Sequence, residues 1–237
     1  MRIVKPSFEI IDDVDGETIL RKIERCGRIS YKSEPKKELV RKDEEGRELF
    51  SSRPMDLTPH TAKSAEEFVS RLIRRGHESV LEHVSITVHV VCDRGISHEI
   101  VRHRIASYTQ ESTRYCNYSE ERFGSELTFV APYFWADDRY GNKARYDEWK
   151  VMMHEAEQYY LSMIQGGASP QEARSILPNS LKTEIMVTMN LREWRHFFRL
   201  RTAKDAHPQM REIATPMLVE FKRLIPVVFD SIVGVSK

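Results

Sequence analysis

Two alternating runs of residues, far apart in the chain, constrain the fold of this protein most. VSITVHVVC alternates from Val84 to Cys92, and KTEIMVTMNL, residues 182–191, alternates in the same way, so each run predicts a strand. In the first run, the side chains that share one face of the strand are Val84, Ile86, Val88 and Val90. Helical patterns surround the two runs without regular β-α-β alternation, which favours one α+β domain over residues 1–237.

The other elements follow from shorter patterns. Apolar spacing predicts helices near residues 16–31, 58–75, 94–104, 140–165, 169–177, 191–201 and 208–225. Short strands are predicted over residues 1–11 and 127–132. Residues 32–50 carry many charges with little apolar periodicity, so we expect a solvated loop there.

Charge and hydropathy limit the classes of partner. The 37 lysines and arginines nearly balance 36 aspartates and glutamates, and the formal net charge of +1 disfavours nucleic-acid binding, which usually needs a basic face. No signal-peptide pattern precedes the first charges, and no apolar run approaches the ~18 residues of a membrane span. We therefore expect a cytoplasmic protein without nucleic-acid or membrane partners.

The spacing of cysteines and histidines argues against a disulfide framework and a metal site. Cys26, Cys92 and Cys116 are far apart and form no C-x-x-C pair, so each is interpreted as a small apolar residue. One catalytic cysteine stays open as an alternative. In GHESVLEH, His77 and His83 lie about 240° apart on a helix, whereas a zinc-binding H-E-x-x-H helix places its histidines on one face. We predict no metal site.

The segment RHRIASYTQESTRY, residues 102–115, concentrates anion-binding donors on a chain that is otherwise electrically balanced. If Arg102 and Arg104 end a helix, their side chains point about 200° apart, so one ligand would not easily hold both. Ser112 and Arg114 are expected to share one face of extended backbone, where a hydroxyl and a guanidinium suit a phosphate. The segment therefore predicts a small anionic ligand.

The C-terminal run NLREWRHFFRLR has the spacing of an amphipathic helix. It places Trp194, Phe197 and Phe198 on one side, which we interpret as core packing. The chain contains neither G-x-G-x-x-G nor G-x-x-x-x-G-K-[ST]. A bound nucleotide would therefore depend on arginine and hydroxyl side chains.

Four segments together resemble one known family, the flavin-dependent thymidylate synthases. RHRIASYTQES satisfies the R-H-R-x(7)-S pattern of that family, and GHESVLEH is similar to its G-H-x-x-x-x-E-H segment. EARSILP resembles its A-R-x-x-L-P helix. NLREWRHFFRLR, followed by AHPQMRE, resembles its N-x-R-x-x-x-x-F-x-x-L-R block. The likeness runs from about residue 1 to residue 225.

The resemblance implies reductive methylation of dUMP to dTMP. Methylenetetrahydrofolate would supply the one-carbon unit, FAD would carry the hydride and NADPH would reduce the flavin. It also implies a single mixed domain, with a central β-sheet flanked by helices, in a homotetramer whose active sites are assembled from several subunits.

The matched motifs also imply roles for individual residues. The catalytic residues would be Arg201, which favours the ionised uracil ring by stabilising negative charge, and His77, near the flavin and folate. FAD would contact Ser79, Arg102, His103, Arg104, Gln110, Asn190, Arg192, His196 and His207. The nucleotide would contact Glu99, Arg102, Gln110, Glu111, Ser112, Thr113, Arg114, Arg174 and Arg201.

Some positions depart from the family pattern. Glu99 stands where a glutamine often precedes R-H-R, and Thr109-Gln110 replaces a frequent Asn-Glu. His196 replaces a common asparagine, and the segment after Arg201 is longer than in some relatives. These changes bear on single contacts, above all on a carboxylate role at position 110, and leave the R-H-R-x(7)-S motif intact.

Two alternatives come from other classes of protein. A phosphate- or RNA-binding module would show a basic face and steep salt dependence without a flavin. A cysteine-dependent methyltransferase would lose activity when its nucleophile, Cys26, Cys92 or Cys116, is replaced.

Overall fold

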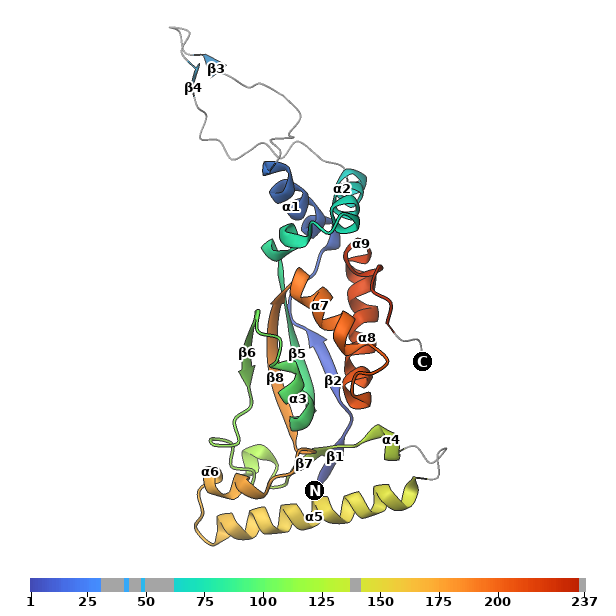
Figure 1. The fold of residues 1–237 in the computed structure, drawn as a ribbon. Coiled ribbons are helices and arrows are strands. Elements are labelled where there is room, and N and C mark those ends of the chain that lie inside the picture. Colours follow the sequence, from blue (N-terminus) through green and yellow to red (C-terminus); the bar gives the residue numbers. More distant parts are fainter. Residues whose placement is uncertain (31–40, 43–47, 50–61, 137–141, 235–237) are drawn as a thin grey trace.

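The fold is built around a four-stranded antiparallel sheet. The structure is a computed structural model that describes residues 1–30, 41–42, 48–49, 62–136 and 142–234. The strand order is β2 (Ser7–Ile10), β5 (Ser85–Asp93), β8 (Lys182–Asn190) and β6 (Ala106–Gln110), and helices lie along the sheet and across its ends (Figure 1). The predicted α+β class, with a central sheet and flanking helices, is confirmed.

The two alternating runs of the sequence pair with each other along their whole length. The register runs from Ser85 opposite Asn190 to Asp93 opposite Lys182. On one face of this pair, the side chains are 1% exposed or less: Ile86, Val88, Val90, Ile185, Val187 and Met189. Both predicted strands are therefore confirmed, and their shared apolar face is the floor of the main core.

Helices from both halves of the chain complete the main core, some along the sheet and others beyond its end (Figure 1). They are α1 (Gly16–Ile29), α2 (Ala62–Arg74), α3 (Arg94–Ile100), α7 (Leu191–Arg201), α8 (Pro208–Leu224) and α9 (Pro226–Phe229), with the short 3-10 helix η1 (Glu78–His83). Side-chain capping explains where α1 and α7 begin, because Asp15 accepts from the Glu17 N–H and Asn190 accepts from the Glu193 N–H. None of the helices in these described ranges is long and apolar enough to cross a membrane.

The aromatic side chains of α7 are core residues, as the sequence predicts. Trp194 is 1% exposed and donates its indole N–H to the carbonyl of Ile86 at 3.0 Å. Its ring packs on Phe198 and Phe221, with centroids 5.7 and 5.1 Å away, and Phe229 closes the cluster against Phe221. This contact joins α7 and α8 to the sheet.

A second, smaller core forms beyond the end of the sheet where β8 begins. The parallel strands β1 (Arg2–Val4) and β7 (Thr128–Val130) lie there with the long helix α5 (Lys143–Gln165) crossing beneath them (Figure 1). Around them are η2 (Glu121–Phe123), α4 (Tyr133–Ala136), α6 (Pro170–Ala173) and η4 (Arg174–Ile176). The buried side chains include Leu127, Phe129, Trp149, Met153, Tyr160 and Leu181.

Several predicted boundaries change in the structure. The single strand expected over residues 1–11 is two strands in different sheets, because Pro6 between them lacks an N–H for a ladder. The helix expected over 94–104 ends at Ile100, and the helix over 169–177 is one α turn followed by a 3-10 turn. Most of the charged segment 32–50 lies outside the described residues, apart from the short pair β3 (Arg41–Lys42) and β4 (Glu48–Leu49).

Truncating the aromatic cluster of the main core tests this packing. Phe221→Ala removes a ring that is 1% exposed, and we expect a loss of about 3–5 kcal/mol in unfolding free energy. Val219→Ala on the same helix, at a side chain 63% exposed, is the matched control and should change stability by less than about 0.5 kcal/mol. Equal effects of the two variants in urea unfolding would contradict this packing.

Candidate functional site

The R-H-R segment lies in a turn that follows α3, not within the helix. Val101 caps α3, and the chain turns through Arg102 before β6 begins at Ala106. The Tyr108 hydroxyl fastens this turn, since it lies within hydrogen-bond distance of the carbonyls of Ile100, at 2.9 Å, and of His103. The expected 200° divergence on a helix is therefore wrong for these residues.

The three side chains of the segment nevertheless point to different surroundings. His103 is 4% exposed, whereas Arg102 and Arg104 are exposed. Within the described ranges, neither arginine forms an ion pair or a side-chain hydrogen bond. The turn thus buries the histidine and presents two free cations to solvent.

Hydrogen bonds on both ring nitrogens fix the protonation of His103. Arg201 donates its Nε–H to His103 Nε2 at 3.1 Å, and His103 Nδ1 lies 3.0 Å from Glu193 Oε1. An arginine has no acceptor, so Nε2 must be unprotonated and the ring proton must lie on Nδ1, facing Glu193. Burial lowers the pKa of His103 below its usual 6.5, and the Arg201 charge lowers it further, although Glu193 opposes both effects. His103 is therefore a neutral ring.

Arg201 is held at the last turn of α7 by Glu99 as well as by His103. Its terminal nitrogens donate to Glu99 Oε2 at 2.8 Å and to the Glu99 carbonyl at 2.9 Å. The two side chains are 17% and 29% exposed. The sequence analysis assigned both residues to the nucleotide, and the structure brings them together at the edge of the R-H-R turn.

Further predicted FAD contacts gather where β8 ends and β5 begins. Asn190 caps α7, Arg192 pairs with Glu82 of η1, and the exposed His196 has its ring 5.5 Å from that of His103. Ser79 on η1 and His77, directly before it, are both exposed. The Leu191 N–H donates to the Val84 carbonyl at 2.9 Å, which joins the end of η1 to the start of α7.

Glu78, between His77 and Ser79, fastens η1 to α7. It accepts from Arg195, which is 1% exposed, at 3.0 Å and from Arg199 at 2.9 Å. Burial would raise the pKa of Glu78, but these two guanidinium groups overcome that effect and lower it. This carboxylate therefore stays ionised and holds η1, with His77 and Ser79 on either side of Glu78, against α7.

His207 lies apart from this group. It caps α8, and its Nδ1 accepts from the Gln209 N–H at 3.3 Å. The side chain of Gln209 donates to Asp93 Oδ2 at 2.9 Å, and Asp93 is at the far end of β5, opposite Lys182. One chain therefore does not bring His207 together with His77 and Ser79.

The residues after β6 form a turn, which corrects the expected extended backbone. The Tyr115 N–H donates to the Ser112 carbonyl at 3.1 Å, and the Arg114 N–H donates to Ser112 Oγ at 3.3 Å. Thr113 is buried, whereas Arg114 is exposed beside the ring of Tyr115. The reason is local, because a serine hydroxyl competes well for the N–H two positions ahead.

Gln110 and Glu111 point into the protein and support this turn. Gln110 Nε2 donates to Ser97 Oγ at 2.9 Å and to Thr183 Oγ1 at 3.1 Å. The carboxylate of Glu111 accepts from Tyr118 at 2.8 Å and from Lys182 at 3.0 Å. Both side chains therefore anchor the segment that carries Ser112 and Arg114.

The predicted site cations form two groups at opposite ends of β6. One group lies at the R-H-R turn with Arg201, and the other lies near Ser112 with Arg114 and Arg174. Ala106 is opposite Met189 and Gln110 is opposite Ile185, so the strand separates the R-H-R turn from the Ser112 turn by roughly 13 Å. Arg174 is exposed and directly follows α6. The helix α6 lies at the end of the sheet where β8 begins (Figure 1). Arg201, bonded to His103, belongs to the opposite end of β6.

Comparison with known proteins decides the family. Residues 11–227 match the family described as "Thymidylate synthase complementing protein". The chain belongs to this family.

Curated relatives carry the name "Flavin-dependent thymidylate synthase". A protein of Pyrococcus furiosus is 44% identical over 159 residues, which are 67% of this chain and 63% of that protein. One of Thermococcus onnurineus is 41% identical over 162 residues, covering 68% and 64%, and one of Geobacter sulfurreducens is 34% identical over 170 residues, covering 71% and 70%. The matches thus span somewhat less than two thirds of the length of the Pyrococcus and Thermococcus relatives.

The sequence patterns did not identify one carboxylate beside the R-H-R turn, that of Glu193. Glu193 is 8% exposed, and its only sequence signal is its place three residues after the N-cap Asn190. His103, Glu193 and His196 bring potential metal-ligand atoms within 4.8 Å of one another. Both nitrogens of His103 are already hydrogen-bonded, however, and the Arg201 cation adjoins the ring, so this cluster suits a metal ion poorly.

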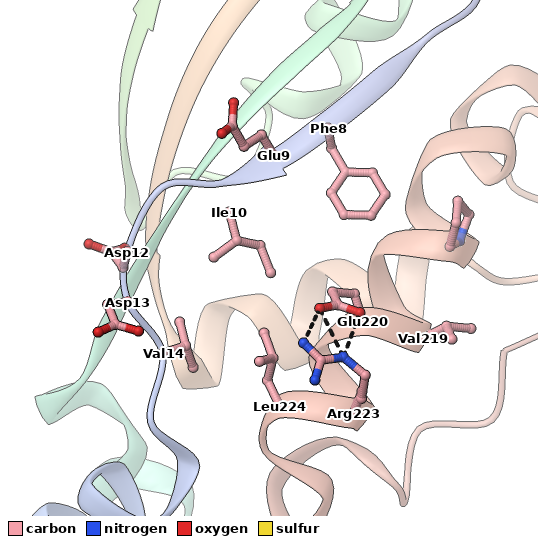
Figure 2. Close-up of a pocket in the computed structure, with 11 residues that line it drawn as sticks. Phe8, Glu9, Ile10, Asp12, Asp13, Val14, Val219, Glu220, Arg223 and Leu224 are labelled. Atoms are coloured by element: carbon pink, nitrogen blue, oxygen red, sulfur yellow. Dashed lines mark hydrogen bonds and ion pairs between the residues drawn. The ribbon is translucent and has the colours of Figure 1, made fainter.

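A pocket at the edge of the sheet is separate from these residues. It lies between β2 and α8, with Phe8, Ile10 and Leu224 as apolar walls and several carboxylates at its rim (Figure 2). Its arginine, Arg223, pairs with Glu220. None of the predicted site residues lines this pocket, and its charge is wrong for a phosphate.

The neutral state of His103 predicts how stability depends on pH. The pKa of His103 is lowered in the folded chain, so as the pH falls below about 6.5 this ring gains a proton in the unfolded chain first. The free energy of unfolding therefore decreases as the pH falls, until the pH passes the lower pKa of the folded chain. We expect the unfolding free energy of the wild type to fall more between pH 7.5 and pH 5.5 than that of His103→Gln. His98→Gln, at an exposed position of α3, is the control and should follow the wild type. Parallel pH curves for wild type and His103→Gln would contradict a neutral ring.

Proposed function

We propose that this protein is a flavin-dependent thymidylate synthase. It converts dUMP to dTMP, with methylenetetrahydrofolate as one-carbon donor, FAD as hydride carrier and NADPH as reductant. The observation that carries the proposal is the R-H-R-x(7)-S segment, which buries His103 between Glu193 and Arg201 and leaves Arg102 and Arg104 exposed. Membership of the family supports it.

The donors at the R-H-R end fit a flavin dinucleotide. Arg102 and Arg104 lack anionic partners among the described residues, and guanidinium groups bind diphosphates well. Ser79, Asn190, Arg192 and His196 supply neutral and cationic donors around the same end of β8. We assign these side chains to binding and orienting FAD, which supplies hydride chemistry when bound, and His77 to the flavin and folate side.

The turn after β6 suits the phosphate of dUMP. The Arg114 N–H bonds back to Ser112 Oγ, Thr113 between them is buried, and Arg114 keeps its guanidinium exposed. Arg174 is a second exposed cation at this end of the sheet, without an ion pair among the residues described. We assign Gln110 and Glu111 to holding the turn, because their side-chain atoms are bonded inside the protein.

Arg201 and Glu99 suit the uracil end of the nucleotide. A guanidinium fixed by His103 stabilises negative charge that develops on the ring, and this help is greatest when the cation is held before the reaction begins. Arg201 also pairs with Glu99, so a nucleotide has to share or displace that contact.

The separation of the two cation groups favours sites shared between chains. One β6 strand keeps Arg201 and the Ser112 turn apart, whereas a single dUMP needs a phosphate site and a uracil site side by side. We therefore propose a cytoplasmic homotetramer in which the uracil end and the phosphate end of each site come from different subunits.

The two alternative classes fit the structure less well. An RNA-binding module needs a continuous basic face, and here Glu99, Glu82 and Glu78 pair with the arginines beside the R-H-R turn. A cysteine-dependent methyltransferase needs a thiolate. Burial raises the pKa of Cys92, which is fully buried, and of Cys116.

The absorption spectrum and the reaction test this function together. We expect the purified protein to bind FAD with a flavin spectrum and to form dTMP from dUMP, methylenetetrahydrofolate and NADPH. Cys26→Ala and Cys116→Ala should keep this activity, because neither thiol takes part. dTMP formation without flavin, or its loss in either cysteine variant, would show that the chemistry is of another class.

Replacing Arg201 separates the two halves of the reaction. In Arg201→Ala, we expect NADPH to reduce the flavin at nearly the wild-type rate, whereas oxidation by methylenetetrahydrofolate and dUMP slows about 10²- to 10³-fold. Arg201→Lys should recover only part of this rate, because lysine keeps the charge without the planar fork. Anaerobic stopped-flow measures both steps, and a normal oxidative step in Arg201→Ala would remove the assigned role.

A further inference from the structure

Glu193 is a buried carboxylate for which family resemblance predicts no role. It lies in the first turn of α7, and its Oε1 accepts the hydrogen bond from His103 Nδ1 at 3.0 Å. We propose that Glu193 is a positioning residue that holds His103 in the Nδ1–H tautomer and thereby fixes the orientation of Arg201. The consequence for the nucleotide rests on the proposed function, whereas the tautomer does not.

The argument begins with the order of donors along one chain of hydrogen bonds. Arg201 can only donate, so His103 Nε2 must accept and His103 Nδ1 must carry the proton. Glu193 is the acceptor for that proton, and Glu99 accepts from the opposite side of the Arg201 guanidinium. Arg201 therefore donates both to His103 and to Glu99, and His103 donates to Glu193.

The surroundings make Glu193 a stable acceptor and His103 an immobile ring. Glu193 lies in the first turn of the eleven-residue helix α7, close to the positive end of the helix dipole. The His103 ring packs against Phe197, with centroids 5.0 Å apart, and the Tyr108 hydroxyl bonds the His103 carbonyl. At 4% exposure, water cannot readily replace a lost partner of the ring.

Loss of the Glu193 carboxylate removes one of the two hydrogen bonds that select this tautomer. A buried Nδ1–H without an acceptor is costly, whereas Arg201 keeps Glu99 as a partner when it turns away, so we expect the ring to relax to the Nε2–H form. That form points a proton at the Nε–H of Arg201, so two donors face each other and the guanidinium has to move. Glu193→Gln avoids this result, because a carboxamide oxygen still accepts from Nδ1.

The direct test is ¹⁵N NMR of histidine-labelled protein above pH 7. The His103 signals are identified among the nine histidines by their loss in His103→Gln. We expect a protonated Nδ1 and a bare Nε2 in the wild type and in Glu193→Gln, and an Nε2–H form in Glu193→Ala. A bare Nδ1 in the wild type would overturn the proposal even if Glu193→Ala fails to fold, and so would an unchanged tautomer in a folded Glu193→Ala.

The second readout is the affinity for dUMP by calorimetry, with flavin content followed by absorbance. Loss of one buried hydrogen bond that orients Arg201 should weaken dUMP binding about ten-fold in Glu193→Ala, with near wild-type affinity in Glu193→Gln. Glu157→Gln, at a buried carboxylate of the second core, is the control and should bind like the wild type.

The possible results separate the two proposals. Wild-type protein that binds no dUMP would overturn the proposed function, and the NMR result would still decide the role of Glu193. Equal dUMP affinity in Glu193→Ala and wild type would show that Glu193 does not act through Arg201.

Discussion

The pairing of β8 along both of its edges determines where the R-H-R turn, the Ser112 turn and the start of α7 lie. β5 pairs with all nine residues of β8 on one side, and β6 pairs with residues 185–189 on the other. Asn190 then starts α7 at one end, while Lys182 and Glu184 fasten the segment after β6 toward the other end. A shift of one residue in this register would turn the apolar face of β8 away from the core, so the positions of both cation groups are tied to core packing.

Within this frame, the neutral ring of His103 links the motif to the helix that follows β8. Its two hydrogen bonds use the first turn of α7, through Glu193, and the last turn, through Arg201. Arg201 is held by His103 and Glu99, and a cation oriented by the protein costs less to orient during a reaction. The same contacts explain why the outer residues of the motif, Arg102 and Arg104, remain available for an anionic ligand.

The sequence best predicts the strands and helices that bury one face in the core. The strands around Val88 and Val187 and the aromatic side of α7 were predictable because one buried face imposes alternation or helical spacing. The end of α3 was not, because a tertiary contact from Tyr108 closes the turn after Ile100. Sequence spacing likewise gave no sign of the serine turn at Ser112, which depends on a side-chain to backbone bond.

Some contacts of the predicted site residues follow from the sequence motifs, and others depend on tertiary structure. The motif match named His103, Arg201 and Glu99, which the structure brings into contact, although pairing of Glu99 with Arg201 was not foreseen. Gln110 and Glu111 are predicted at the ligand from the motif match, and their side chains also bond inside the protein, which only the three-dimensional position of their neighbours reveals. Glu193 was missed because a glutamate near a helix start has an ordinary capping explanation.

The central claim is that each site draws its uracil end and its phosphate end from different subunits. Its most direct test mixes Arg174→Ala with Arg201→Ala under conditions that exchange subunits. Each variant alone should be nearly inactive, and random mixed tetramers should recover up to roughly a quarter of the wild-type rate, because some sites then combine an intact Arg174 with an intact Arg201. Mixed oligomers, verified by mass spectrometry, that recover no activity would contradict the account.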